Sequence, residues 1–156
     1  MNRREIISGA CGTLTLLLAG CMQQGSEQPQ TTVSFSGNVS SWTFDYRKAE
    51  NSSEVSADPS LSCTSKPESI VFSGKMGGGN RDDKIGIVSS EQSDGTLSLT
   101  VSPLPDDEAG EGQVEIYYNY TGAVLFRDGL PQTVEVRESE PGAERSTVLD
   151  TSDCCT

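Results

Sequence analysis

The cysteines and carboxylates are the side chains of this sequence that are best suited to chemistry. The chain has 156 residues, with five cysteines, 23 acidic residues and no histidine. Without an imidazole it cannot form Ser-His-Asp or Cys-His nucleophile pairs, nor zinc, copper or haem sites that depend on histidine. The sequence therefore predicts no catalytic residue, no metal site and no cofactor.

The N-terminal residues have the features of an export signal. Arg3 and Arg4 precede a mostly apolar run from Ile6 to Ala19, which is shorter than the roughly 20 residues of a membrane-spanning helix. The run ends in Leu18-Ala19-Gly20-Cys21, which resembles the lipobox of prokaryotic lipoproteins. In that family the matching thiol receives a diacylglyceryl group and becomes the mature N-terminus. The resemblance implies lipidation of Cys21 and removal of residues 1–20.

The export route has two alternatives. Asn2-Arg3-Arg4-Glu5-Ile6-Ile7 resembles a twin-arginine signal, the address of proteins that are exported already folded. It departs from the fuller pattern, because Asn2 stands where Ser or Thr is usual and Ile6 where Phe is usual. The general secretory route therefore stays open. Cys11 lies inside the signal and is expected to be removed with it.

The expected mature chain is strongly acidic. Removal of residues 1–20 takes away two of 11 basic and one of 23 acidic side chains, which changes the net charge from −12 to −13. Phosphate backbones require clusters of Lys and Arg, so no nucleic-acid partner is expected. The dispersed acids, few lysines and three glycosylation sequons are similar to exported lipoproteins of halophilic archaea, in which carboxylates hold water and cations. An acidic surface protein from a low-salt organism is the alternative.

Three sequons lie in the expected mature chain, none with proline in the middle position. They begin at Asn38, Asn51 and Asn119, and each asparagine is a candidate glycosylation acceptor on an exported chain. Asn51 lies in a polar stretch and is favoured over Asn119, which lies within a strand pattern.

Three further cysteines, Cys63, Cys154 and Cys155, are candidates for a disulfide in an oxidising compartment. Neighbouring residues have Cα atoms about 3.8 Å apart, whereas disulfides prefer about 4.4–6.8 Å. A bond between Cys154 and Cys155 would therefore be strained. We expect Cys63 to pair with one of the two, pinning the C-terminal tail to the domain; the sequence does not decide which.

Other polar clusters match no known site. Asp82-Asp83 and Asp106-Asp107-Glu108 lack the spaced acids of an EF-hand, and adjacent acids usually form a solvated loop. Gly77-Gly78-Gly79 lacks the Gly-Lys-Ser/Thr ending of a phosphate loop and is interpreted as a turn. Trp42 and an outward-facing Tyr117 are candidate binding residues, because amphipathic aromatic side chains are favoured at contact surfaces. Covering a sheet face is the alternative role for Tyr117.

The folded part has the two-residue periodicity of β-strands. Residues 21–32 predict a flexible tether, and residues 33–156 a single β domain with a C-terminal tail. Alternating apolar residues predict about eight short strands, the clearest hairpin turning at Ser93-Asp94-Gly95. A helical turn is expected at Asp58–Leu61 and a loop at Glu138–Ala143. An antiparallel β-sandwich fits best; an immunoglobulin-like form is one version, although Trp42 precedes Cys63.

These features lead to a functional expectation. The leading hypothesis is a lipoprotein anchored at the extracytoplasmic face of the cell membrane, acting as a non-catalytic binding or structural module. Its expected partners are the membrane, through the lipid anchor, and an envelope protein or a glycan. An accessory subunit of a membrane or envelope complex is the second hypothesis. A small hydrolase that uses only carboxylates is the third.

Overall fold

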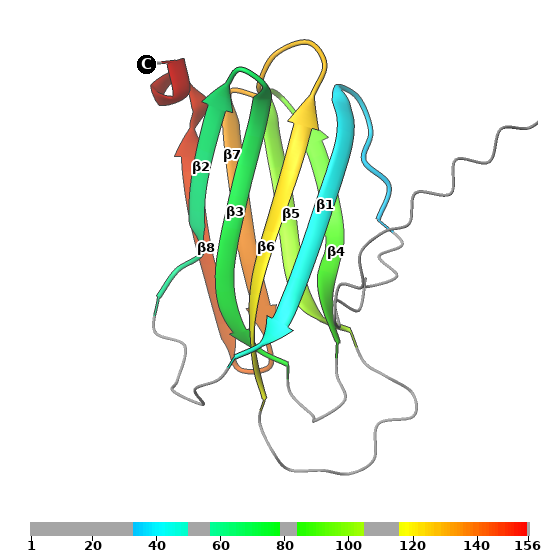
Figure 1. The fold of residues 1–156 in the computed structure, drawn as a ribbon, viewed down its shortest axis with the longest axis vertical. Helices are drawn as coiled ribbons and strands as arrows, with labels where there is room; N and C mark the ends of the chain where they lie inside the picture. Colours follow the sequence, from blue (N-terminus) through cyan, green and yellow to red (C-terminus); the bar gives the residue numbers. More distant parts are fainter. Residues whose placement is uncertain (1–32, 50–56, 79–83, 105–115, 156) are drawn as a thin grey trace, which may run out of the picture.

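The computed structural model describes residues 33–49, 57–78, 84–104 and 116–155. They form eight strands and one short 3-10 helix, η1, arranged as an all-β sandwich (Figure 1). The elements in chain order are β1 (Val39–Lys48), β2 (Ser60–Ser65), β3 (Glu68–Gly77), β4 (Lys84–Ser93), β5 (Thr96–Leu104), β6 (Tyr117–Phe126), β7 (Thr133–Glu140), β8 (Ala143–Asp150) and η1 (Thr151–Cys155).

The strands form two four-stranded sheets. The front sheet in Figure 1 has the order β1-β6-β3-β2, and the back sheet has the order β4-β5-β7-β8. The predicted β-sandwich is therefore confirmed. The strand order differs from the immunoglobulin arrangement, in which the first, second, fifth and fourth strands share one sheet.

One strand pair corrects the expectation of purely antiparallel sheets. β5 and β7 are parallel, with Leu97 opposite Val134 and Leu99 opposite Val136, whereas the other five described pairs are antiparallel. The reason is the strand between them. After β5 the chain crosses to the front sheet, where β6 runs in the opposite direction, and on its return β7 again runs in the direction of β5.

Apolar side chains on alternate residues fill the space between the sheets, as the pleat of a strand dictates. The front sheet contributes large side chains, among them Phe44, Phe72 and Tyr120, and the back sheet contributes aliphatic ones such as Leu99 and Val136. A Cβ at Gly122 would overlap the ring of Phe72. A glycine in the middle of β6 thus makes room for the largest fully buried side chain of the core.

The two hairpin turns of the back sheet are formed at residues that adopt positive φ. The predicted hairpin at Ser93-Asp94-Gly95 is present, with φ of 50° at Asp94 and 77° at Gly95. Such a pair of angles suits a tight hairpin turn and favours the Asp-Gly sequence. The loop expected at Glu138–Ala143 is shorter than predicted, because β7 continues to Glu140 and β8 begins at Ala143, with Gly142 at φ 85°.

A second correction concerns β2. The helical turn expected at Asp58–Leu61 is absent from the described structure; β2 begins at Ser60, opposite Ser73 of β3. Leu61 and Cys63 alternate with exposed serines, so their side chains pack against the core from the edge of the front sheet. The neighbouring strand supplies backbone partners that an isolated Pro-Ser turn would lack, and this pairing outweighs the local turn preference.

A disulfide joins Cys63 of β2 to Cys154 of η1, with Cα atoms 5.5 Å apart. The pairing that the sequence left open between Cys154 and Cys155 is therefore resolved in favour of Cys154. The side chain of Cys155 lies outside the described part of the structure. The bond ties the last described element to an edge of the front sheet and bridges 91 residues of sequence.

Replacing Cys63 with serine is expected to lower the free energy of unfolding by about 4 kcal/mol, because a long cross-link restricts the unfolded chain. Urea denaturation under non-reducing conditions measures this loss. Cys63 is the better target, since removing Cys154 leaves Cys155 beside it as a replacement partner. Cys155→Ser is the control and should change stability by less than about 0.5 kcal/mol. Equal losses in both variants would contradict the Cys63–Cys154 pairing.

Candidate functional site

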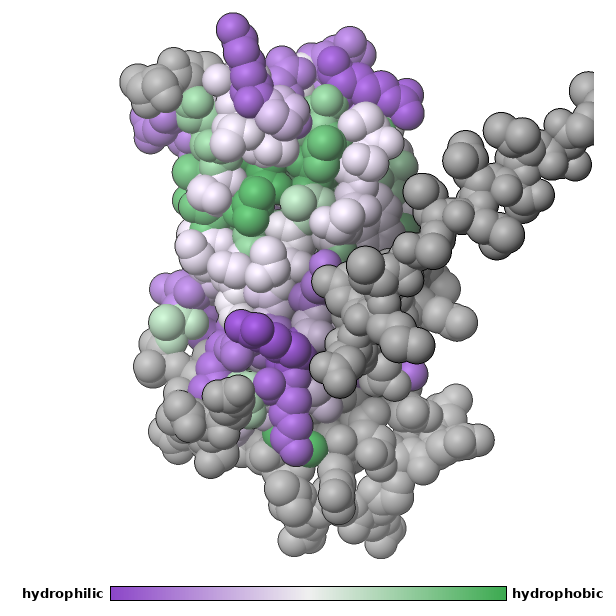
Figure 2. All heavy atoms as spheres, in the orientation of Figure 1, coloured by the Kyte–Doolittle hydropathy of each residue, from purple (hydrophilic) through white to green (hydrophobic). Residues whose placement is uncertain are grey.

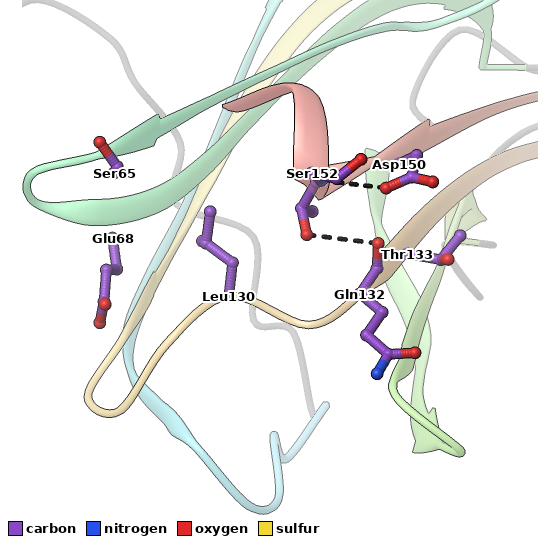
Figure 3. A pocket seen from close by; sticks show the side chains of 8 residues that line it. Ser65, Glu68, Leu130, Gln132, Thr133, Asp150 and Ser152 are labelled. Carbon is purple, nitrogen blue, oxygen red and sulfur yellow. Dashed lines mark hydrogen bonds between the residues drawn. The ribbon is translucent and has the colours of Figure 1, made fainter. Parts of the chain in front are cut away.

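A hollow of about 540 Å³ lies at the end of the sandwich that carries the disulfide (Figure 3). It is bounded by the β2–β3 turn, by the segment between β6 and β7, and by the junction of β8 with η1. Its lining consists of Ser65, Glu68, Leu130, Gln132, Thr133, Asp150, Thr151 and Ser152. Its volume falls within the range of about 300–1,000 Å³ that is common for small-molecule sites.

The junction of β8 with η1 is held to the segment before β7 by Thr151. Its backbone N–H donates to the carbonyl of Gln132 at 3.0 Å, and its hydroxyl donates to the carbonyl of Pro131. Asp150 accepts a hydrogen bond from the N–H of Ser152 at 2.9 Å, and this bond holds the pKa of that exposed carboxyl below its usual range. Thr151 is thus committed to the fold, while Asp150 presents an ionised oxygen.

The opposite wall is fixed by two side chains that bind the turn after β6. Glu68 accepts a hydrogen bond from the N–H of Gly129 at 2.8 Å. Asn38 donates its amide N–H to the carbonyl of Gly129 at 2.7 Å and accepts from the N–H of Asp128 at 2.8 Å. Both polar atoms of Asn38, the first predicted glycosylation acceptor, therefore take part in holding this turn.

The lining is suited to uncharged or cationic ligands and not to anions. In Figure 3 Glu68 and Asp150 lie on opposite sides of the hollow, with Leu130 between them. Because the two carboxylates lie apart, they do not converge on one reacting group. None of the eight lining residues is a lysine, arginine or cysteine. The hollow can offer hydroxyls and an amide as donors or acceptors of hydrogen bonds, and two carboxylates as acceptors.

The described residues contain no group of three or more Cys, Asp or Glu side chains placed to hold a metal ion. Asp82-Asp83 and Asp106-Asp107-Glu108, considered as oxygen ligands, lie outside the described residues.

A second polar cluster lies inside the sandwich, and sequence reasoning missed it. Glu138 of β7 has no exposed surface; it accepts hydrogen bonds from the hydroxyl of Tyr120 at 2.6 Å and from Nε of Arg145 at 2.8 Å. Nη2 of Arg145 forms an ion pair with Glu140 at 2.7 Å, and Glu140 also accepts the N–H of Gly77 at 2.6 Å. The periodicity contained the signal, since Glu138 continues the inward-facing positions Val134 and Val136.

Burial and hydrogen bonds together shift the pKa values of the three side chains Glu138, Tyr120 and Arg145. Burial raises the pKa of Glu138, and hydrogen bonds from Tyr120 and Arg145 oppose that rise. Burial, followed by the bond to Glu138, also raises the pKa of Tyr120 far above its usual range. Burial lowers the pKa of Arg145, but its bonds to Glu138 and Glu140 outweigh that effect and raise it overall.

The cluster connects the two sheets. Tyr120 belongs to the front sheet and Glu138 to the back sheet, and a Cβ at Gly74 would overlap both Oε1 of Glu138 and the hydroxyl of Tyr120. Glycine at position 74 therefore leaves room for the hydrogen bond between Tyr120 and Glu138. Each carboxylate of the cluster has a protein partner, which indicates a structural role.

The two candidate aromatic residues have different surroundings. Trp42 is half-buried and packs against Phe35, with ring centroids 5.2 Å apart, at the border of the core. It therefore covers part of the core and keeps part of its surface exposed. Tyr117 is also half-buried, and Nζ of Lys75 lies 5.4 Å from its ring centroid. The outward direction predicted for Tyr117 places it on the outer face of the front sheet, two residues before Asn119.

Two other predicted residues, Cys21 and Asn51, lie outside the described residues. In the part that the structure describes, no helix is long and apolar enough to cross a membrane. Comparison of the chain with protein-family models, with curated proteins and with solved structures finds no match. The fold and the surfaces described above are therefore the basis for a functional proposal.

The buried position of Glu138 gives stability a specific dependence on pH. Because its folded pKa is raised above the ordinary value of 4.5, the native state binds this proton more tightly than the unfolded chain does. The contribution of Glu138 is largest below about pH 4.5 and is lost as the pH rises through the folded pKa. We expect the free energy of unfolding of the wild type, minus that of Glu138→Gln, to fall as the pH is raised.

Urea denaturation at several pH values between about 4 and 8 measures this difference. Glu144→Gln, which removes one negative charge at an exposed position of β8, is the matched control and should show a smaller dependence. A wild-type advantage that is constant or grows with pH would contradict the assignment.

Proposed function

We propose that this protein is a lipoprotein anchored through Cys21 at the extracytoplasmic face of the cell membrane, where its β-sandwich acts as a non-catalytic binding or structural module. The observation that carries the proposal is the Cys63–Cys154 disulfide. Structural disulfides persist in oxidising compartments outside the cytoplasm. This agrees with the apolar N-terminal run and the lipobox-like Leu18-Ala19-Gly20-Cys21.

A role in binding or structure is supported by the partners of the ionisable side chains. The most buried acid, Glu138, is bonded to Tyr120 and Arg145, and Glu140 to Arg145 and a backbone N–H. These groups stabilise contacts between strands. The hollow near Asp150 presents hydrogen-bonding groups at the disulfide-linked end of the fold, an arrangement that favours recognition of a ligand.

The accessory-subunit hypothesis is favoured by a different observation. Among the described strands, β8 pairs only with β7, and its Thr147 hydroxyl also donates a hydrogen bond to the carbonyl of Pro59, ahead of β2. Val148 on this strand is 60% exposed, the largest exposure of the large apolar side chains in the described structure. Exposed edges with apolar residues are sites where another chain can add a strand. Crosslinking on intact cells followed by mass spectrometry distinguishes this hypothesis by revealing a stoichiometric protein partner.

Cys21→Ser should release the protein from the membrane fraction, because a lipid chain can no longer be attached to the thiol. Fractionation of cells and medium followed by immunoblotting measures the change. Cys11→Ser is the matched control, since it removes a cysteine from the segment that is expected to be cleaved. Continued membrane retention of Cys21→Ser, or equal release of Cys11→Ser, would show that the anchor is not at Cys21.

A further inference from the structure

The hollow near Asp150 lies where the two sheets end together, and both sheets contribute to its lining. Ser65 pairs with Glu68 at the β2–β3 turn of the front sheet, and Thr133 pairs with Asp150 in the back sheet. The segment between β6 and β7 crosses from one sheet to the other and forms the third side. Figure 2 shows hydrophilic side chains at this upper end of the molecule, above a band of apolar ones. The hollow therefore opens from a polar part of the surface.

The disulfide holds two walls of the hollow together. Ser65 is the last residue of β2, and Ser152 lies in η1. The Cys63–Cys154 bond joins these two elements, and hydrogen bonds from Thr151 fix the start of η1 to the segment before β7. Because the walls are already connected, binding of a ligand would require less ordering of the chain.

The lining keeps polar groups that the fold does not use. Among the hydrogen bonds of the described residues, none involves the side chain of Ser65, Gln132 or Thr133. Glu68 and Asp150 each accept one backbone N–H, but a carboxylate has about four lone-pair positions, so acceptors remain on both. The hollow therefore offers two charged acceptors together with hydroxyl and amide groups that both donate and accept.

A sugar ring supplies the groups that complement this lining. Its hydroxyls can donate hydrogen bonds to Glu68 and Asp150, and they can donate to and accept from hydroxyl and amide side chains. The C–H faces of the ring are apolar and can pack on Leu130, the one apolar side chain among the eight lining residues. The volume of about 540 Å³ is typical of small-molecule sites, so it suits a sugar unit rather than a long stretch of polymer.

The charge of the lining disfavours an anionic ligand. No lining residue is basic, and the neighbouring Lys66 and Arg127 form no ion pair in the described part of the chain. The undescribed stretches 50–56, 79–83 and 105–115 follow strands whose last residues lie at the other end of the sandwich. A phosphate, sulfate or uronate in the hollow would therefore face two carboxylates without a cation from the lining to balance them.

A cationic ligand would use the lining less completely than a sugar. Glu68 and Asp150 lie on opposite sides of the hollow in Figure 3, so a single ammonium group would reach only one of them. It would also leave the side chains of Ser65, Gln132 and Thr133 without partners. An uncharged ligand with several hydroxyls is the class that engages most of the lining.

We propose that the hollow near Asp150 binds an uncharged sugar unit of a glycan. Hydroxyls of the sugar donate to Glu68 and Asp150, one face of the ring packs on Leu130, and the uncommitted hydroxyl and amide side chains bind the remaining sugar hydroxyls. This deepens the proposed function, on which it rests, by naming the binding site and the class of partner.

The test applies the purified full chain to an array of glycans that end in an uncharged hexose. The protein is kept in a polyoxyethylene detergent, because a sugar-based detergent would compete for the site. Matched glycans end in the corresponding uronate or in the corresponding hexosamine with a free amine. Hexose-terminated glycans should bind, and their uronate counterparts should bind at least about tenfold more weakly because of repulsion by the two carboxylates.

Calorimetry with the hexose-terminated oligosaccharide that binds most tightly then compares two variants. Asp150→Asn should lower the affinity at least about tenfold, as expected for loss of a charge-assisted hydrogen bond. It keeps an oxygen that can accept the N–H of Ser152, so the start of η1 is preserved. Asp153→Asn is the matched control, because it removes the same charge from an exposed position of η1 outside the lining. It should change the affinity less than about twofold, and thermal unfolding verifies that both variants are folded.

Several outcomes would overturn the proposal. These are no binding of any hexose-terminated glycan, equal binding of the uronate counterparts, or equal losses in Asp150→Asn and Asp153→Asn. Tighter binding of the free-amine glycans would assign the hollow to a cationic ligand instead. These measurements concern the purified chain, so they are separate from the location of the protein, which the Cys21→Ser fractionation tests.

Discussion

The contact between the inward faces of the two sheets is the constraint on which the rest of the structure depends. Phe72 fills the space left by Gly122, and the same contact has to accommodate a glutamate that is wholly buried. Glu138 is tolerated because Tyr120 and Arg145 bond both of its oxygens. A buried carboxylate without these partners would cost several kcal/mol. The interior is thus mainly apolar, with one satisfied polar connection between the sheets.

Features set by neighbouring residues could be predicted from the sequence. The hairpin at Asp94-Gly95, the inward register of Val134 and Val136, and the participation of Cys63 in a disulfide all follow from local pattern or from the expected compartment. The parallel pairing of β5 with β7 could not be predicted from the sequence. The alternation of apolar and polar residues indicates which face of a sheet a side chain occupies, but it does not indicate which strand lies beside it.

The candidate sites were predicted less completely than the fold. Tyr117 was selected for its type and outward direction, but its neighbours Arg47 and Lys75 come from strands far apart in the sequence. The polar cluster around Glu138 was missed because acids near a strand end usually form loops, although its periodicity matched the core. In both cases the information lay in the register between strands, which a single sequence does not specify.

The position of β1 has a consequence for the order in which the sheets of this chain can be completed. Its only described partner is β6, with Val39 opposite Phe126, so β1 cannot be paired before β6 has been synthesised. The β2–β3 and β4–β5 hairpins can form from strands that are adjacent in sequence, but the front sheet cannot be completed until β6 lies between β1 and β3. A chain that lacks its second half would therefore leave β1 without a described partner strand.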